Sequence, residues 1–268
     1  MFVGHQYVVR DFQRLIATQR LAQGYIFFGE PQVGKFYFAK HLAHALENGV
    51  FALSEHWIAQ DACILESASG IADMRRIQRF LWQKPAVSSH RTVIINDTEQ
   101  LTPEAQNAIL KITEEPPPHG LIILITQQLD SLLSPIISRF QKIYFGRLSE
   151  PEMMQLEKSE RVRSIAYGRP GRLYRLKDDP EFAAAQELFQ AFRRASPMQR
   201  STYIKDLVEQ QKERPRILDY FFELWIIALR RDSVQNMEEL RRVQHRLFLI
   251  KSYTTNKRLQ LEALTVNL

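Results

Sequence analysis

Five short apolar runs recur in the first 145 residues, and each has the length and the β-branched or aromatic content of a buried strand. They lie at residues 25–28, 63–65, 92–95, 121–125 and 142–145. The segments between these runs have the periodicity of helices. Met74, Ile77 and Leu81, for example, share one helix face. Strands that alternate with helices predict an α/β fold with a parallel five-stranded sheet and flanking helices.

One of the predicted helices carries clear signals at both ends. Thr102 is expected as its N-cap and Pro103 as its first helical residue, and the prolines at 116–118 end it. Its spacing predicts that one apolar face is buried, formed by Ala105, Ala108, Ile109 and Ile112.

The strand pattern stops after about residue 147. Helical patterns follow near 181–194, 198–211, 214–232 and 236–252, separated by polar or proline-containing connections. The sequence therefore predicts an α/β domain at residues 1–147, a small helical segment at 148–180 and an all-α domain at 181–268.

Composition narrows the class of protein. The formal net charge of +6 is compatible with a nucleic acid or an acidic partner and identifies neither. The single cysteine, Cys63, cannot build a four-cysteine metal site within one chain. The N-terminus lacks a basic segment followed by an apolar core, and no apolar run is long enough to cross a bilayer. We expect a cytoplasmic protein that is not bound to a membrane.

Residues 29–36 read Gly-Glu-Pro-Gln-Val-Gly-Lys-Phe, between a predicted strand and an apolar helix. This is the context of a phosphate-binding P-loop, in which glycines let backbone N–H groups surround phosphate. Gly29 and Gly34 would shape the loop, and Lys35 would reach the outer phosphates. The alternative is a tight turn at the two glycines with Lys35 in solvent.

Three residues that would be expected to serve catalysis beside this loop are altered. Phe36 stands where a Ser or Thr hydroxyl would bind magnesium. Asn96, after the strand at 92–95, has no charge for the metal, and Asp97 is shorter than the glutamate that orients the attacking water. These changes predict that the chain does not hydrolyse ATP efficiently by itself. Asn96 and Asp97 could instead cap a turn.

Within residues 96–118, residues 102–117 read Thr-Pro-Glu-Ala-Gln-Asn-Ala-Ile-Leu-Lys-Ile-Thr-Glu-Glu-Pro-Pro, close to the pattern T-x-E-A-x-N-A-L-L-K-x-x-E-E-P-P. With this stretch the chain closely resembles bacterial clamp-loader AAA+ subunits of DNA polymerase III. Further matches lie in order at 3–5, 70–75, 138–140 and 168–172, so the resemblance covers residues 1 to about 178. Within this family the chain is most similar to the delta-prime branch. The well-studied members of that branch do not hydrolyse ATP and serve a neighbouring ATPase subunit.

The resemblance implies an AAA+ domain, a helical lid at 148–180 and a collar at 181–268 used for oligomerisation. It also implies a hetero-pentamer with gamma/tau ATPase and delta subunits, which loads the sliding clamp on primer-template DNA within the DNA polymerase III holoenzyme. ATP or ADP would bind, if at all, without turnover. Two alternatives stay open, an active gamma/tau-like ATPase and a free-standing DNA-binding adaptor.

The resemblance also assigns site residues. Ser138-Arg139-Phe140 is similar to the family's Ser-Arg-Cys motif, whose arginine enters the ATP site of the adjacent subunit; otherwise Arg139 is an ordinary surface arginine. Thr126 matches the first sensor and Arg172 the second, with a strand-end cap and a solvated charge as alternatives.

Two further expectations concern metal and DNA. Many relatives hold zinc with four cysteines between the first helix and the second strand, but residues 47–61 contain none, so no zinc is expected. Paired arginines at 193–194, 230–231 and 241–242 would contact either DNA or solvent.

Overall fold

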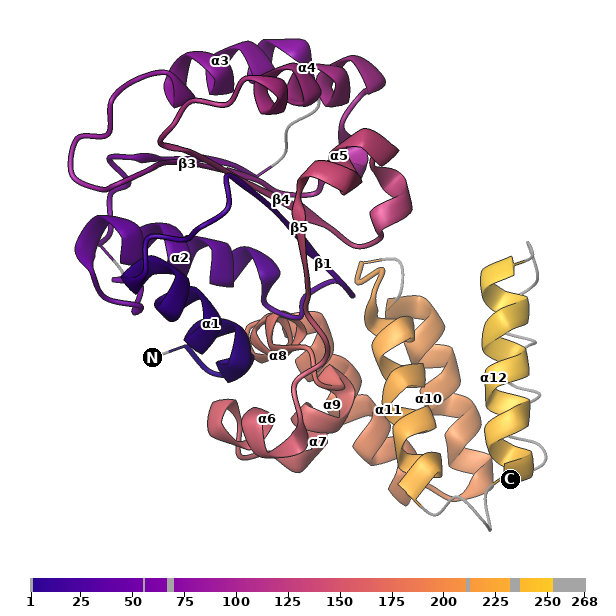
Figure 1. Cartoon of the computed structure of the whole chain (residues 1–268). Coiled ribbons are helices and arrows are strands. Elements are labelled where there is room, and N and C mark those ends of the chain that lie inside the picture. Colours follow the sequence, from indigo (N-terminus) through magenta and orange to yellow (C-terminus); the bar gives the residue numbers. More distant parts are fainter. Residues whose placement is uncertain (1, 55, 67–69, 211–212, 232–236, 253–268) are drawn as a thin grey trace. The chain divides into compact units, whose positions relative to one another are not determined.

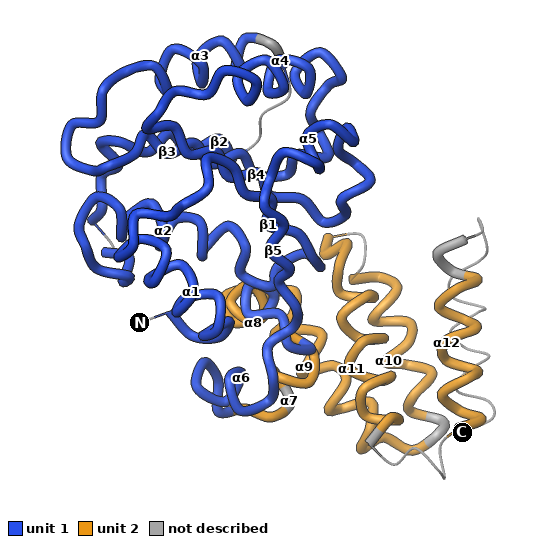
Figure 2. The backbone as a smooth tube through the Cα atoms, in the orientation of Figure 1, with its two compact units in different colours: residues 1–158, 167–172 blue, residues 159–166, 173–268 orange. Residues whose placement is uncertain are grey.

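The computed structural model describes residues 2–54, 56–66, 70–210, 213–231 and 237–252 (Figure 1). The chain divides into two compact units (Figure 2). The first contains residues 1–158 and 167–172, and the second contains residues 159–166 and 173–268.

The first unit is built on five parallel strands in the order β2-β3-β4-β1-β5. Their bounds are β1 Gly24–Phe28, β2 Ala62–Leu65, β3 Arg91–Ile95, β4 Gly120–Thr126 and β5 Gln141–Tyr144. The predicted parallel five-stranded sheet is thereby confirmed. Because all strands run in one direction, the residues that follow them gather at one edge of the sheet, which we call the carboxyl edge, and those that precede them gather at the opposite, amino edge.

Helices cover both faces of this sheet (Figure 1). One face holds α1 (Gln6–Ala17) and α2 (Lys35–Asn48), and the other holds α3 (Ile71–Leu81), α4 (Pro103–Glu114) and α5 (Ser134–Arg139). Strand β1 supplies both cores, since Ile26 packs on the α3 side whereas Tyr25 and Phe27 pack on the α1 side. This alternation follows from the two-residue period of a strand.

Helix α4 begins and ends as predicted, with the Thr102 hydroxyl accepting a hydrogen bond from the Ala105 N–H at 3.2 Å. Its buried face differs at two positions: Ala108 is only partly buried, and Gln106 is buried although it was not expected to be. The Gln106 amide satisfies backbone groups of the chain that leads into α5, which explains how a polar side chain can be buried there.

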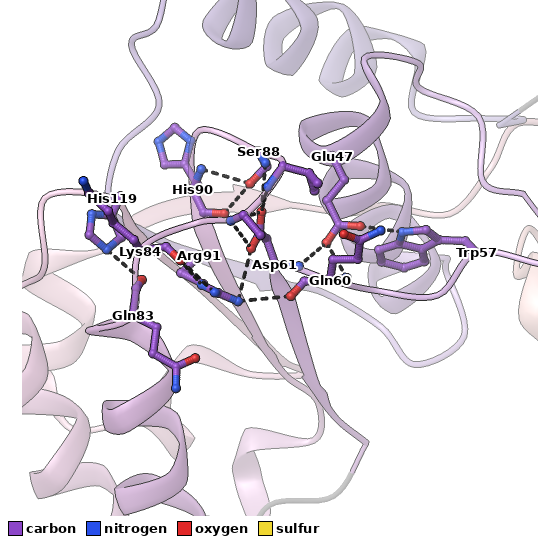
Figure 3. Close-up of polar contacts among 12 residues, drawn as sticks. Glu47, Trp57, Gln60, Asp61, Gln83, Lys84, Ser88, His90, Arg91 and His119 are labelled. Carbon is purple, nitrogen blue, oxygen red and sulfur yellow. Dashed lines mark hydrogen bonds and ion pairs between the residues drawn. The ribbon is translucent and has the colours of Figure 1, made fainter.

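The segment between α2 and β2, where many relatives have their cysteines, is held by carboxylates (Figure 3). Glu47 accepts hydrogen bonds from the Trp57 indole at 2.7 Å and from the backbone N–H groups of Gln60 and Asp61 at 3.1 and 2.7 Å. Among the residues that the structure describes, no group of three or more His, Cys, Asp or Glu side chains is arranged to hold a metal ion.

Asp61 continues this network at the amino edge of the sheet (Figure 3). Its buried carboxylate accepts hydrogen bonds from three consecutive backbone N–H groups, at residues 86–88, and pairs with Arg91 at 3.1 Å. Burial opposes ionisation, but these donors outweigh it, so the pKa of Asp61 is lowered. The network fixes the start of β3.

Short elements complete the first unit: two 3-10 turns, η1 (Thr98–Gln100) and η2 (Leu129–Ser131), and α6 (Glu150–Leu156). The second unit is helical, with α7 (Glu160–Ala166), α9 (Pro180–Arg194), α10 (Pro197–Gln210), α11 (Ile217–Arg231) and α12 (Met237–Ser252). Helix α8 (Pro170–Lys177) starts in the first unit and continues into the second. The four helical patterns predicted after residue 180 are confirmed as helices within the described residues, and residues 211–212, 232–236 and 253–268 of the predicted all-α domain lie outside them.

The core of the second unit is aromatic. Phe192 on α9 lies 5.3 Å from the Phe221 ring and 4.8 Å from the Trp225 ring, both on α11. Asp179 caps α9 by accepting a hydrogen bond from the Glu181 N–H, and it also accepts one from the Tyr220 hydroxyl at 2.7 Å. None of the helices in the described ranges is both long enough and apolar enough to cross a membrane.

Candidate functional site

The predicted P-loop lies at the carboxyl edge, between the end of β1 and the first residue of α2. Its two glycines have positive φ values, 135° at Gly29 and 105° at Gly34. A side chain at Gly29 would also collide with the backbone carbonyl of Phe145. The loop conformation therefore requires the glycines that the sequence provides.

Lys35 is folded onto this loop and is only 7% exposed. Its ammonium donates hydrogen bonds to the carbonyl oxygens of Gly29, at 2.5 Å, and Glu30, at 2.7 Å. Loss of hydration lowers the pKa of Lys35 to about 8, although the carboxylates of Glu99, Asp97 and Glu30 oppose this change. The loop thus binds its own lysine. Lys35 is therefore not the solvent-exposed charge that the alternative interpretation expects.

Two acids face Lys35 from the turn after β3. Asp97 has a φ of 48° and precedes η1, and burial together with the charge of Glu99 raises its pKa. Glu99 accepts a hydrogen bond from the backbone N–H of Gln127, which follows β4. The sequence indicated Asp97 but not Glu99, because only the turn of η1 brings Glu99 back toward the loop.

The two positions expected to serve magnesium do not fit that task. Phe36 packs its ring against the core between the sheet and α2, and the Lys40 ammonium lies 4.7 Å from the ring centroid. Asn96 makes a long hydrogen bond, 3.4 Å, from its amide to the carbonyl of Glu66 after β2. Neither side chain presents an anionic oxygen to a metal, so these residues do not suit a magnesium–nucleotide centre.

Thr126 ends β4 directly beside the last residue of β1, since it pairs with Phe28. Its hydroxyl is buried and bonds locally, to the Gln128 carbonyl at 2.8 Å and the Ser131 hydroxyl at 3.0 Å. In this arrangement Thr126 caps the strand end and supports η2.

The outer side of the loop is tied to the residues around 167–172. Arg147 pairs with Glu30 through two contacts of 2.8 and 2.9 Å, and its guanidinium lies 4.1 Å from the Tyr167 ring centroid. The backbone N–H of Gly171 donates to the Gln32 carbonyl at 2.9 Å. Arg172, the predicted second sensor, therefore follows directly on a residue that contacts the loop.

Arg139 lies at the opposite, amino edge of the sheet. It is the last residue of α5 and precedes β5, whose first residue pairs with Tyr25 near the start of β1. At about 3.3 Å per residue, β1 alone separates this edge from the P-loop by roughly 13 Å. The Arg139 guanidinium is exposed and forms an ion pair of 3.2 Å with Glu114 at the end of α4. The sheet thus separates Arg139 from the loop of its own chain.

Phe140, which replaces the family's cysteine, anchors this edge. Its side chain is buried in the core on the α3 side. It lies so close to Gly24 that a Cβ atom there would approach the ring to 2.6 Å. Arg139 therefore projects from a chain segment whose next residue is fixed in the core.

Gln106 is a second residue, after Glu99, whose role the sequence did not reveal. Its amide donates to the Ser131 carbonyl at 3.1 Å and accepts from the Leu133 N–H at 2.8 Å, so α4 holds the chain that leads into α5. The only sign of this role in the sequence is that a glutamine lies beside the apolar positions of an amphipathic helix.

The paired arginines of the second unit lie at its surface where they are described. Arg193 and Arg194 are exposed, as are Arg230, Arg241 and Arg242, whereas the side chain of Arg231 lies outside the described residues. Exposure of these five side chains fits both interpretations, contact with DNA and contact with solvent.

Comparisons with known proteins place this chain in a family. The model of the family "DNA polymerase III, delta subunit" matches residues 4–149, more than half of the chain. The chain is 29% identical over 167 residues to DNA polymerase III subunit gamma/tau of Mycoplasma pneumoniae, covering 57% of this chain and 24% of that one. It is 27% identical over 161 residues to subunit tau of Bacillus subtilis, covering 55% of this chain and 29% of that one.

Solved structures include two similar proteins of Thermotoga maritima. A DNA polymerase III gamma subunit-related protein aligns over 97% of both chains with 18% identity and a TM-score of 0.45. The RuvB Holliday junction branch migration motor aligns over 72% of this chain and 65% of its own, with 14% identity and a TM-score of 0.48. The family match over residues 4–149 and the gamma/tau relatives lead to one conclusion: the chain belongs to the DNA polymerase III delta-subunit family of clamp-loader AAA+ proteins.

Proposed function

We propose that this chain is a delta-prime-like clamp-loader subunit that does not hydrolyse ATP itself and supplies Arg139 to the ATP site of a neighbouring subunit. One observation carries the proposal: Arg139 lies at the sheet edge opposite to its own P-loop, and that loop lacks the magnesium-binding groups at Phe36 and Asn96. An arginine so placed lies too far from its own loop to act there, which supports a role at the site of another chain.

The chemistry of this role is electrostatic. A guanidinium presents fixed N–H donors to the oxygens of the phosphoryl group while it is transferred. Such arginines accelerate the reaction roughly 10³- to 10⁵-fold where they have been analysed. Phe140 in the core and Gln106 on α4 would hold Arg139 in place, and Glu114 would keep the guanidinium at the surface until a phosphate competes for it.

The proposed partners follow from the family. They are a gamma/tau ATPase subunit and a delta subunit in a hetero-pentamer that loads the sliding clamp on primed DNA. Residues 148–180 would form the lid and the helices of 181–268 the collar. The sensor roles of Arg172 and Thr126 are part of the same proposal, and any ATP or ADP on the Lys35 loop would be held without turnover.

The test is ATP turnover by the reconstituted complex in the presence of primed DNA. We expect Arg139→Ala to lower turnover strongly, Arg139→Lys to restore little because it lacks the planar fork, and Lys35→Ala to leave turnover within about twofold. Arg79→Ala, at an exposed arginine on α3, is the matched control. A larger loss from Lys35→Ala than from Arg139→Ala would reverse the proposed division of roles.

Two measurements address the alternatives. Magnesium-dependent ATP hydrolysis by the isolated chain would favour a gamma/tau-like ATPase. Failure of the chain to co-elute with the ATPase and delta subunits in a size measurement would favour a free-standing adaptor.

A further inference from the structure

A groove between α1 and β5 in the first unit has no part in the function proposed above. Its volume is about 630 Å³, within the range of ligand sites. Tyr7, Asp11 and Arg14 line it from α1, Arg20 from the segment that follows, and Lys142 and Tyr144 from β5. We propose that this groove binds single-stranded nucleic acid, with phosphates on its cations and bases on its tyrosines.

The charge of the groove is positive. Arg14 and Arg20 are exposed, and neither guanidinium forms a hydrogen bond or ion pair with the part of the chain that the structure describes. Lys142 is also exposed and donates only to the Ile137 carbonyl, at 3.2 Å. Asp11 is the one acid among the described lining residues. Cations whose charge is not neutralised within the protein attract a polyanion and release its counterions.

Two tyrosine rings provide platforms for bases. Tyr7 is 57% exposed and Tyr144 is 55% exposed. The Tyr7 hydroxyl donates to the Tyr144 carbonyl at 3.2 Å, and the Tyr144 ring lies 5.4 Å from the ring of Phe28. These contacts orient the rings before a ligand arrives, so little side-chain freedom is lost on stacking.

An acidic peptide is the other polyanionic ligand that such a groove would attract. An extended peptide would bind most simply by adding a strand to β5, which lies at the edge of the sheet. The Tyr144 carbonyl on this strand is already taken by the Tyr7 hydroxyl, and Lys142 is a charged edge residue of the kind that blocks strand pairing. The exposed aromatic faces therefore favour nucleic acid.

The test is fluorescence anisotropy of the full chain with a labelled oligo-thymidylate of about 20 nucleotides over a range of salt concentrations. We expect Tyr7→Ala to weaken binding by about 5- to 150-fold, the loss of one stacked base. Tyr7→Phe keeps the ring and loses only the hydroxyl contact that orients it, so its loss should be clearly smaller than that of Tyr7→Ala. The double variant Arg14→Gln with Arg20→Gln should reduce the slope of log affinity against log salt by about 1.4, for two lost phosphate contacts.

Two controls separate the groove from the overall positive charge. Arg75→Gln with Arg79→Gln removes the same charge from the exposed side of α3, and Tyr174→Ala removes another tyrosine that is 55% exposed. Circular dichroism verifies the fold of each variant. The groove variants should weaken binding at least fivefold more than their controls.

Three results would overturn the proposal: equal losses in groove and control variants, no binding of the oligonucleotide, or groove-dependent binding of a labelled oligo-glutamate peptide in its place. Since these experiments use the isolated chain with Arg139 intact, their outcome is independent of the ATP-turnover test.

Discussion

Replacement of Lys35 by methionine should make the folded protein more stable at neutral pH. The pKa of Lys35 is lowered from 10.5 to about 8, mainly because the ammonium is buried. This difference corresponds to roughly 3 kcal/mol of unfavourable free energy for the charged form in the folded state. The Met variant avoids that term but gives up hydrogen bonds to the carbonyls of Gly29 and Glu30, each worth about 1 kcal/mol. We expect a net gain of about 1 kcal/mol at pH 7.

The pH dependence gives the sharper test. Between pH 8 and 10.5 the unfolded chain holds a proton on Lys35 that the folded chain has released, so the stability of the parent rises with pH across this window. The Met variant lacks this group. The difference in unfolding free energy, variant minus parent, should therefore fall by roughly 3 kcal/mol from pH 7 to above pH 10.5 and change sign on the way.

Urea unfolding followed by tryptophan fluorescence measures this difference. Trp57 and Trp82 report on the first unit, and a Trp225→Phe background removes the tryptophan of α11 in the second unit. Lys111→Met, at an exposed position on α4, controls for the loss of a lysine. A variant-minus-parent difference that stays constant from pH 7 to above pH 10.5 would show that Lys35 is not held as described.

Other predictions concern contacts that shape the two sheet edges. Asp61→Ala should destabilise the protein by about 3–5 kcal/mol in urea unfolding, because Arg91 and three N–H groups lose their buried partner. Since the pKa of Asp61 is lowered from 3.8, the parent's share of this stability is complete above pH 3.8 and should vanish as the pH falls further, leaving a smaller difference in acid. Gln106→Leu should cost about 1–3 kcal/mol by leaving the Ser131 carbonyl and Leu133 N–H unpaired, and an unchanged midpoint would contradict this account. Gly24→Ala should be destabilising in the parent and much less so beside Phe140→Cys, which a double-mutant cycle would measure.

The sheet was predictable because each strand is a short apolar run bounded by polar or turn residues, as at Gly29 after β1. The placement of Arg139 was also contained in the sequence, since it precedes a strand whereas the P-loop follows one, and parallel strands keep these ends apart.

Other features of the site depend on tertiary structure. The sequence is the same whether the Lys35 side chain extends into solvent or bonds to the carbonyls of Gly29 and Glu30. The packing around the side chain decides between these two conformations. Glu99 reaches the loop through the turn of η1, and Gln106 is buried because two backbone groups near α5 need partners. Hydrophobic periodicity along one element contains no information about such distant partners.

The separation of Arg139 from the P-loop gives the subunit a polarity. Contacts that join the arginine edge of one copy to the loop edge of the next are head-to-tail, and they close a ring or extend a row only if both faces of every member are competent. Under the proposed function, this chain has a working arginine edge and an altered loop edge, so it would donate across one face without being activated across the other. Under the proposed function, a row of ATPase subunits would therefore carry this chain at one terminus, where it sets the direction of the row and limits its length.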